Sequence, residues 1–303
     1  MTGAPALSRA ARARRLRTDL TGWAFVAPAL LLFLLFVIWP MGHAVWISLH
    51  RWDGLGQMAW LGLDNYRFVF GDKVFWKAMH NTFIYAFGVT VAKNLLALGL
   101  ALLLNRPLRG RGFFRTASFT PVVLSFVVVG VLWSWIFDPT FGLLNAVLWA
   151  LGLQGLIQGW LSDPDIALYS IMFVDVWKWT GYHTVLFLAG LQTIPSELIE
   201  AGRLEGKPRQ VFRHVTLPLL MPVVAFSVLL SIVGAFVSNY DLVRVMTQGG
   251  PFHSTEVALT WITTTAFRFN NFGKADAMSV ILFLIVAVLG AVQFLLMRQR
   301  GRG

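Results

Sequence analysis

Six long apolar runs, separated by short polar segments, dominate the pattern of this chain. A hydrocarbon core about 30 Å thick is spanned by roughly 20 apolar residues in an α-helix, and each run reaches that length. The runs lie near residues 22–49, 82–104, 116–137, 166–191, 217–240 and 275–297. The pattern predicts an all-α polytopic membrane protein with six transmembrane helices.

These runs form one transmembrane domain, 22–297, between two short basic ends, 1–21 and 298–303. The first run follows an Arg-rich segment, as the apolar part of a signal peptide does, but it is too long and no small-residue cleavage pattern follows it. We therefore expect a retained helix there. Some of the basic N-terminus is expected to lie against anionic membrane lipid.

Positive charge is distributed unevenly between the segments that join the runs. Sixteen of the 25 Lys and Arg residues fall on the side that carries both chain ends: Arg9, Arg12, Arg14, Arg15, Arg17, Arg106, Arg109, Arg111, Arg115, Arg203, Lys207, Arg209, Arg213, Arg298, Arg300 and Arg302. Six fall on the other side: Arg51, Arg67, Lys73, Lys77, Arg244 and Arg268. Since cytoplasmic loops are enriched in Lys and Arg, both termini are predicted to be cytoplasmic.

The composition excludes several functional classes. Hydrophobic residues make up 57% of the 303 residues and charged residues only 13%, which is typical of an integral membrane protein. Cysteine is absent and the six histidines lack a ligand-like spacing, so neither disulfides nor a metal site is expected. The net charge of +11 lies in loops beside membrane runs and comes without a nucleic-acid-binding motif, so no nucleic-acid partner is expected.

A polar segment between the fourth and fifth runs predicts a helix on the membrane surface. Pro195 and Ser196 form a helix start with a capping side chain, and Glu197 and Glu200 suit its first turn. The sequence Gly206-Lys207-Pro208 predicts a break before the chain re-enters lipid at Leu217-Pro218. Such a helix fits either a groove on a soluble partner or a connector held at the lipid headgroups.

This loop, 192–218, resembles the EAA loop of ABC importer permeases, the cytoplasmic loop that docks on the ATPase. The residues that carry the resemblance are Glu200, Ala201, Gly202, Glu205, Gly206, Leu217 and Pro218. Further stretches resemble the sugar-type branch of these permeases, which includes the maltose and glycerol-3-phosphate importers. They are 25–52, 103–115 (LLNRPLRGRGFFR), 132–145, 175–178, 246–251 (MTQGGP) and 272–279 (FGKADAMS).

The loop also departs from the family pattern. Gly202 stands where alanine is usual, Glu205 where aspartate is usual, and Lys207 replaces a common small residue. Glycine lowers local helix propensity by about 1 kcal/mol relative to alanine. We expect the coupling helix to be tuned differently rather than lost.

The resemblance implies a permease in a bacterial or archaeal cytoplasmic membrane. Its expected partners are ABC ATPase subunits, a second permease subunit in a heterodimer or a homodimer, and an extracytoplasmic solute-binding protein that contacts outer loops such as 246–255. No cofactor and no catalytic residue are expected in this chain, because it lacks a GxxxxGK[ST] loop. ATP and Mg are expected on the partner ATPase.

Polar residues within or beside the runs are candidates for the substrate path. Ser238, Asn239 and Tyr240 together offer a hydroxyl, an amide and an aromatic ring, groups that bind sugars. By the resemblance, the Ser238-Asn239 position faces the path. Tyr182, His183 and Ser279 are further candidates, and each of these residues could instead serve only in interhelical hydrogen bonds.

Three charged residues are expected inside the membrane, where charge is unfavourable unless it is paired. Asp175 and Lys178 are three residues apart and predict a pair on one helix face, whereas Lys93 is expected to snorkel or to find another partner.

The expected substrate is a mono- or oligosaccharide, with glycerol-3-phosphate or a glycerophosphodiester as the alternative. An ion-coupled secondary transporter is a rival class, but it usually needs a coupling-ion site and an internal repeat. An intramembrane enzyme is a weaker rival, because no catalytic motif is present.

Overall fold

Helix α4, residues Lys73–Leu104, runs most of the length of the molecule, and helices α8 and α11 pack along it. The computed structural model describes residues 22–300, without the side chains of Ser238, Phe294 and 296–300. The predicted basic segment 1–21 and residues 301–303 lie outside the described residues. Nearly all of the described secondary structure is helical, in agreement with the predicted all-α class.

The elements that cross the molecule are joined by short ones at its two ends. The longer elements are a helix at 22–48 that contains η1 (Leu34–Ile38) and α2 (Trp39–Ser48), then α4, α5 (Arg111–Val123), α6 (Phe126–Ile136), α8 (Ala167–Gln192), α11 (Leu217–Met246) and α13 (Phe272–Arg300). The shorter ones are β1 (His50–Arg51), β2 (Ala59–Trp60), α3 (Asp64–Gly71), α7 (Leu143–Ala150), η2 (Gln154–Leu156), α9 (Ser196–Glu205), α10 (Pro208–Val211), η3 (Phe212–Thr216), α12 (Ala258–Thr263) and η4 (Thr264–Arg268).

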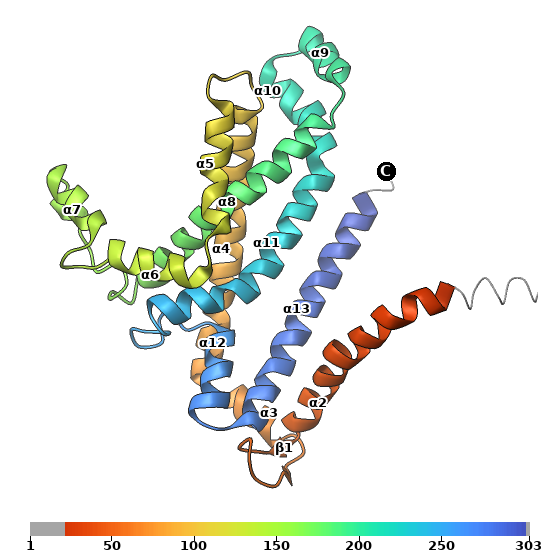
Figure 1. Cartoon of the computed structure of the whole chain (residues 1–303), viewed down its shortest axis with the longest axis vertical. Coiled ribbons are helices and arrows are strands. Elements are labelled where there is room, and N and C mark those ends of the chain that lie inside the picture. The colour runs from red at the N-terminus through yellow and green to blue at the C-terminus, as the bar shows by residue number, and fades with distance from the viewer. Residues whose placement is uncertain (1–21, 301–303) are drawn as a thin grey trace, which may run out of the picture.

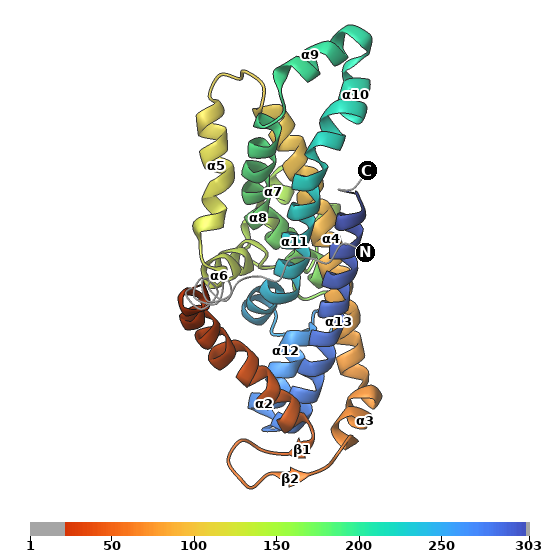
Figure 2. The ribbon, with the colours of Figure 1, turned by 90° about the vertical axis from the view of Figure 1, so that its right-hand side faces the viewer.

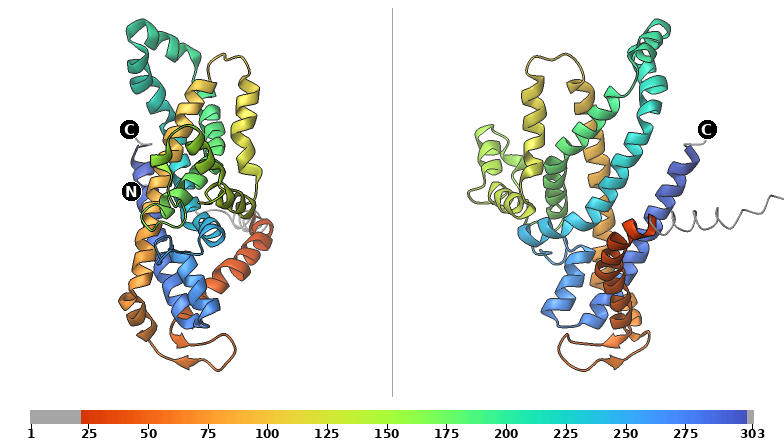
Figure 3. Two further views of the ribbon diagram at one scale, coloured as in Figure 1. Left: turned by 90° about the vertical axis from the view of Figure 1, so that its left-hand side faces the viewer. Right: turned by 45° about the vertical axis from the view of Figure 1, so that its right-hand side comes forward.

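The two ends of the molecule differ in what they carry. Helices α9 and α10 and the turn between α4 and α5 lie at one end, and the antiparallel β1–β2 hairpin, α3 and α12 lie toward the other (Figures 1 and 2). The helix at 22–48 meets the hairpin at its C-terminal end, α2, and its N-terminal part slopes away from the α4–α8–α11 bundle (Figure 3). The loops that were predicted to face the cytoplasm therefore share one end.

Three clusters of buried apolar side chains hold the bundle together. The central cluster joins α4, α6, α8 and α11 around Tyr85, Ile171 and Leu242. A second cluster joins α3, α4, α12 and α13, and a third joins α4, α8 and α11 near α9. Helix α5 lies against α8 at Gly181, where an added Cβ would meet the carbonyl oxygen of Ser118 at 1.8 Å.

Four of the described helices are long and apolar enough to cross a membrane, and the bent pair α5–α6 makes a fifth if it is counted as one span. The four are Gly22–Ser48, Lys73–Leu104, Pro208–Val237 and Phe272–Gln293. Helix α8 is also long, at 26 residues, but it is too polar to belong to this group. The molecule is therefore a helical membrane protein with several spans.

Two predicted spans need correction. The run at 82–104 begins earlier, at Lys73, because the Asp72 carboxylate caps the helix by accepting hydrogen bonds from the backbone N–H groups of Val74 and Phe75 at 2.9 and 3.1 Å. The run at 116–137 is not one straight helix. It is divided into α5 and α6, and the chain bends by 102° between these two helices.

Two prolines in long helices follow widened turns. Pro40 lies two residues after the π-helical segment η1, and Pro218 lies two residues after η3. A proline has no N–H to donate and its ring crowds the preceding turn. A π-helical turn relieves both problems, so each helix continues past its proline.

Candidate functional site

The first candidate region is the end of the molecule formed by α9. This helix spans Ser196–Glu205, begins directly after Pro195 and ends at Gly206, which has an extended backbone. The positions of its start and of the break before Pro208 agree with the prediction. The predicted capping side chain is absent, because the N-cap residue Pro195 makes no side-chain hydrogen bond to the helix. Of the two acidic residues predicted for the first turn, Glu197 lies there, and Glu200 lies beyond it.

One face of α9 packs on the chain, and the other is exposed. Ile199 packs against the buried cluster of α4, α8 and α11, whereas Leu204 is 90% exposed. Gly202 faces the next helical segment, where an added Cβ would lie 3.3 Å from a methyl carbon of Val211. Alanine would fit there only with a small adjustment. Glycine, at this position where the resembling permeases usually have alanine, therefore permits a close approach of α9 and α10.

The charged side chains of α9 make no ion pair among the described residues. Glu197, Glu200, Arg203 and Glu205 are all exposed, and no ion pair within the described residues involves them. Leu217 and Pro218 lie at the start of α11, where Pro218 is exposed. The end of the molecule therefore presents a helix with free charges.

The second candidate region is a set of buried polar groups between α4 and α8. Asp175 Oδ1 lies 3.5 Å from Lys93 Nζ, and the Tyr85 hydroxyl donates to Asp175 Oδ2 at 2.9 Å. All three residues are at most 2% exposed. Because Asp175 pairs with Lys93, the predicted Asp175–Lys178 pair is wrong.

Lys178 instead holds the bend between α5 and α6. Its ammonium group donates to the backbone carbonyls of Pro121, Val122 and Leu124 at the break, and the Pro121 carbonyl also accepts from the Leu124 N–H. The ammonium group also lies 4.9 Å from the centre of the Phe126 ring. A buried lysine on α8 therefore satisfies the backbone where the predicted third span is interrupted.

A closed ring of hydrogen bonds joins α4, α8 and α11. Ser227 Oγ donates to Asn94 Oδ1, and Asn94 Nδ2 donates to Ser231 Oγ at 2.9 Å. His183 lies between the two serines, with Nδ1 2.7 Å from Ser227 Oγ and Nε2 3.3 Å from Ser231 Oγ. The Ser227 hydroxyl donates its proton to Asn94, so Ser227 Oγ can only accept from His183. The four hydrogen bonds are therefore satisfied by a neutral His183 that carries its proton on Nδ1 and accepts from Ser231 at Nε2.

A cavity of about 270 Å³ lies beside this ring. Its lining residues come from α4, α8 and α11: Lys93, Trp179, Tyr182, His183, Leu230, Gly234 and Val237. Tyr182 and His183 were predicted for the path, and the structure brings them together with their ring centres 5.4 Å apart. Aromatic rings, a hydroxyl and an amine around a small cavity can bind a polar organic molecule by stacking and hydrogen bonding.

The other predicted path residues do not line this cavity. Asn239 is fully buried, and neither amide atom has a hydrogen-bond partner in the described structure. Tyr240 lines a different cavity, and the Ser279 hydroxyl donates to the carbonyl of Ala275 within α13. Ser238 lies on α11, but its side chain is not among those described.

Sequence reasoning missed Asn94, Ser227 and Ser231, and it did not foresee the partner of Lys93. Ser227 and Ser231 are four residues apart in an apolar helix and are both fully buried. This spacing places two hydroxyl groups on one face. It is the signal that could have indicated a polar ring in the membrane.

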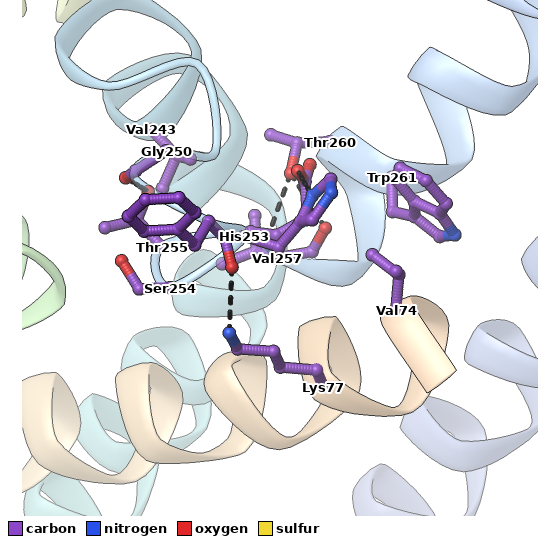
Figure 4. Close-up of polar contacts among 12 residues, drawn as sticks. Val74, Lys77, Val243, Gly250, His253, Ser254, Thr255, Val257, Thr260 and Trp261 are labelled. Atoms are coloured by element: carbon purple, nitrogen blue, oxygen red, sulfur yellow. Dashed lines mark hydrogen bonds and ion pairs between the residues drawn. The ribbon is translucent and has the colours of Figure 1, made fainter. Parts of the chain in front are cut away.

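The loop after α11 is fixed by contacts with α4. Lys77 points from α4 toward this loop and donates to the carbonyl of Phe252 at 2.9 Å (Figure 4). Asn81 donates to the carbonyls of Ser254 and Glu256, both at 2.9 Å, and His253 lies 3.1 Å from the Glu256 carboxylate. The Phe252 side chain itself remains 85% exposed.

The hairpin at the same end is shaped by Asp53. Its carboxylate accepts hydrogen bonds from the backbone N–H groups of Gly56 and Leu55, at 2.8 and 3.0 Å. These two bonds lower the pKa of Asp53 below its ordinary value, since they favour the charged form. Within the described residues, no group of three His, Asp or Glu side chains could hold a metal ion.

The comparison with known families decides what these features belong to. Residues 93–300 match the family described as the inner membrane component of binding-protein-dependent transport systems. This chain belongs to that family. It is thus an ABC importer permease, a multi-pass protein of the inner membrane, and the likeness of its relatives places it in the sugar-type branch.

Several named relatives align with almost the whole chain. The lactose transport system permease protein LacF of Rhizobium radiobacter is 36% identical and covers 93% of this chain and 95% of its own length. The trehalose/maltose permease protein MalF of Thermococcus litoralis is 34% identical, covering 88% and 89%. The sn-glycerol-3-phosphate permease protein UgpA of Pectobacterium atrosepticum is 32% identical, covering 92% and 94%.

A solved structure agrees with the fold of this permease. A chain of a bacterial ABC transporter involved in the import of the acidic polysaccharide alginate superposes with a TM-score of 0.81. That superposition covers 94% of this chain and 98% of the other, at 21% sequence identity. The bent α5–α6 pair and the projecting α9 thus belong to an architecture that matches an ABC importer.

Proposed function

We propose that this permease moves a carbohydrate, either a mono- or an oligosaccharide, across the cytoplasmic membrane, driven by ATP hydrolysis on a separate ATPase subunit. The observation that carries the proposal is the division of α9 into a packed face and an exposed charged face. The packed face places Gly202 against Val211 of α10 and Val215 of η3, and these segments continue directly into α11. A partner that moves α9 would therefore move a membrane helix with it.

The ATPase is proposed to dock on the exposed face of α9, which carries Glu200, Ala201 and Glu205, while Gly202, Gly206, Leu217 and Pro218 are proposed to hold α9 in place for coupling. Acidic side chains with no partner among the described residues can form charge-assisted hydrogen bonds with a basic groove. ATP and Mg would be bound by that subunit, and its closure would switch the permease between inward-facing and outward-facing states. A second permease subunit, expected to be a different chain, would complete the path, and an external binding protein would deliver the substrate.

The proposed topology has six spans and both termini in the cytoplasm. The four apolar helices and the bent α5–α6 pair supply five spans, and α8 supplies the sixth. A helix of 26 residues is about 39 Å long at 1.5 Å per residue, which exceeds the hydrocarbon thickness. Burial of Asp175, Lys178 and His183 against neighbouring helices makes a polar span possible.

Labelling of introduced cysteines tests this topology, because the chain has no cysteine of its own. Ser196→Cys should be shielded from an impermeant thiol reagent in intact cells. Phe252→Cys should react, since Phe252 is 85% exposed. The nearby Ser254 is a poorer site, because its hydroxyl group is buried. Labelling of Ser196→Cys from outside would contradict the six-span topology.

The proposed path includes the cavity of Lys93, Tyr182 and His183. Sugar rings would stack on aromatic side chains, and sugar hydroxyls would bond to the Lys93 ammonium group and the Tyr182 phenol. Asn239 is proposed to reach the substrate in another conformation, because in this one its amide group is buried without a partner. Relatives named for lactose and for trehalose and maltose support a saccharide, and one named for sn-glycerol-3-phosphate keeps that alternative.

Two measurements test the function. Uptake by the reconstituted complex with its binding protein should need ATP and should continue in the presence of an uncoupler. Uptake that an uncoupler abolishes would indicate an ion-coupled carrier instead. A thermal-shift screen of the binding protein against neutral sugars and glycerophosphates would then identify the solute, since a ligand stabilises in proportion to its affinity and concentration.

A further inference from the structure

A second cavity, of about 290 Å³, lies at the opposite end of the molecule from α9. It is lined by Tyr240 and Arg244 from α11 and by Thr263, Thr264, Phe267 and Arg268 from α12 and η4. All of these residues lie beyond the apolar span Pro208–Val237. The volume is close to the lower end of the roughly 300–1,000 Å³ range of small-molecule sites.

The two arginines in this cavity have no partner within the described residues. No hydrogen bond or ion pair there involves the guanidinium group of Arg244 or Arg268, and no acidic residue lines the cavity. Two other cations at this end are engaged: Arg67 pairs with Asp64 at 3.0 Å, and Lys77 donates to the carbonyl of Phe252. Two guanidinium groups therefore share one small space without a counter-charge.

The backbone places these groups together. Tyr240 and Arg244 are four residues apart on α11 and share one face. Thr264 and Arg268 are the first and last residues of the π-helical segment η4, a rare conformation that is frequent at functional sites. Two helical segments thus direct two arginines, a phenol and a hydroxyl group at the same cavity.

We propose that this cavity binds an oxyanion of the transported solute, a carboxylate or a phosphate. Guanidinium groups present paired N–H donors that match the two oxygens of such a group, and the hydroxyls of Tyr240 and Thr264 can add donors. Phe267 offers an apolar surface to the rest of the solute. The inference rests on the proposed import function, and it narrows the substrate to an acidic saccharide or a phosphate-bearing polyol.

A single cysteine in the cavity can report its charge and its occupancy. Thr263 is a suitable position, because its hydroxyl group donates to the backbone carbonyls of Leu259 and Thr260 within its own helix. It is therefore not among the groups proposed to bind the solute. The assembled transporter carrying Thr263→Cys would be treated with an anionic and a cationic methanethiosulfonate reagent of similar size. Gly155→Cys is the matched control, since Gly155 is exposed in the short helical segment η2 and no charged residue lies between 141 and 162.

The ratio of anionic to cationic labelling rates should be at least about tenfold higher at Thr263→Cys than at Gly155→Cys, because two arginines without a counter-charge raise the local concentration of anions and lower that of cations. Arg244→Gln and Arg268→Gln should each lower the ratio. Glucuronate or glycerol-3-phosphate should slow the anionic reagent, and glucose should not. Protection by glucuronate alone assigns a carboxylate, and protection by glycerol-3-phosphate alone assigns a phosphate.

Three results would overturn the proposal. They are a ratio equal to that of the control, labelling that neither oxyanion slows, and a cysteine that is unreactive in the complex but reactive in the separated chain. The last result would show that another subunit covers the arginines. None of these measurements depends on ATP or on uptake, so a failure here leaves the proposed transport function to be judged by its own test.

Discussion

Two helices of similar length show opposite relations between composition and burial. The N-terminal helix Gly22–Ser48 is among the most apolar of the chain, yet none of its apolar stretch is buried within the chain. Helix α8 contains Asp175, Lys178 and His183, and 15 of its 26 residues are buried. In water the apolar helix would be the hidden one. In a membrane, lipid solvates the apolar helix, and the polar helix must be enclosed by protein.

This difference teaches where the specific interactions of the molecule lie. The exposed helix needs only to be apolar, so many sequences would serve. Each polar group of α8 needs a particular partner on α4, α5 or α11. Substitutions in α8 should therefore have large effects that depend on the partner, and substitutions in the N-terminal helix should have small ones.

The largest effect is expected from Asp175→Ala. This change leaves the Lys93 ammonium group buried without its counter-charge, and loss of one partner of a buried ion pair costs about 3–5 kcal/mol. Thermal unfolding of the purified complex should show the loss. The double variant Lys93→Met with Asp175→Leu removes both charges and should recover most of the stability. Equal destabilisation of the single and double variants would show that the pair is unimportant.

Lys178→Met should destabilise the protein by about 2–3 kcal/mol, since each buried group left unpaired costs about 1–3 kcal/mol and some of the carbonyls can find water or new partners. The carbonyls that depend on Lys178 are those of Val122 and Leu124, because the Pro121 carbonyl also accepts from the Leu124 N–H. Lys178→Arg keeps a cationic donor and should lose less. Unfolding of both variants can be compared in detergent. If Lys178→Met is as stable as the wild type, the lysine does not hold the α5–α6 bend.

A smaller effect of opposite sign is expected at Asn239. Asn239→Leu removes a buried amide group that has no partner in this structure, and it should stabilise this conformation by about 1 kcal/mol. Transport should nevertheless fall if the amide meets solute in another state. Asn239→Ala should also lower transport while subunit assembly is retained. Unchanged uptake kinetics in both variants, at normal expression, would remove Asn239 from the path.

The smallest effect is expected in the N-terminal helix. Leu31 is 62% exposed, and Leu31→Ala should change the stability of the separated chain by less than about 0.5 kcal/mol, because lipid replaces the lost contact. Phe187→Ala in α8 is the contrasting variant. Phe187 is 1% exposed, and its truncation should cost about 3–5 kcal/mol. Similar losses at the two positions would remove the distinction between the helices.

The sequence was sufficient for features that depend on local patterns. Apolar length predicted the helical runs, and Pro195, Gly206 and Pro208 predicted where α9 begins and ends. The run at 166–191 was also recognised, although it contains Asp175, Lys178 and His183, and it closely matches α8. The bend at 102° was not predicted, because it depends on Lys178, 54 residues beyond the last carbonyl that it satisfies.

Polar partners were also beyond prediction from the sequence. Spacing of three residues on one helix suggested that Asp175 would pair with Lys178, but helix packing placed Lys93 against Asp175 instead. The polar ring depends on Asn94, His183, Ser227 and Ser231, which come from three helices. Of the predicted path residues, Tyr182 and His183 do share a cavity with one another. Their contact with a solute is still a prediction.

The central claim is that α9 couples this permease to its ATPase, and Glu200→Arg tests it most directly. The change reverses an exposed charge in the middle of α9 and removes any charge-assisted contact that Glu200 makes. Asp165→Arg, an exposed charge reversal near the other end of α8, is the control. Glu200→Arg should lower both ATPase retention on the purified permease and ATP-driven uptake at least about tenfold, while membrane insertion and pairing with the second permease persist. Wild-type ATPase retention and uptake in Glu200→Arg would contradict the claim.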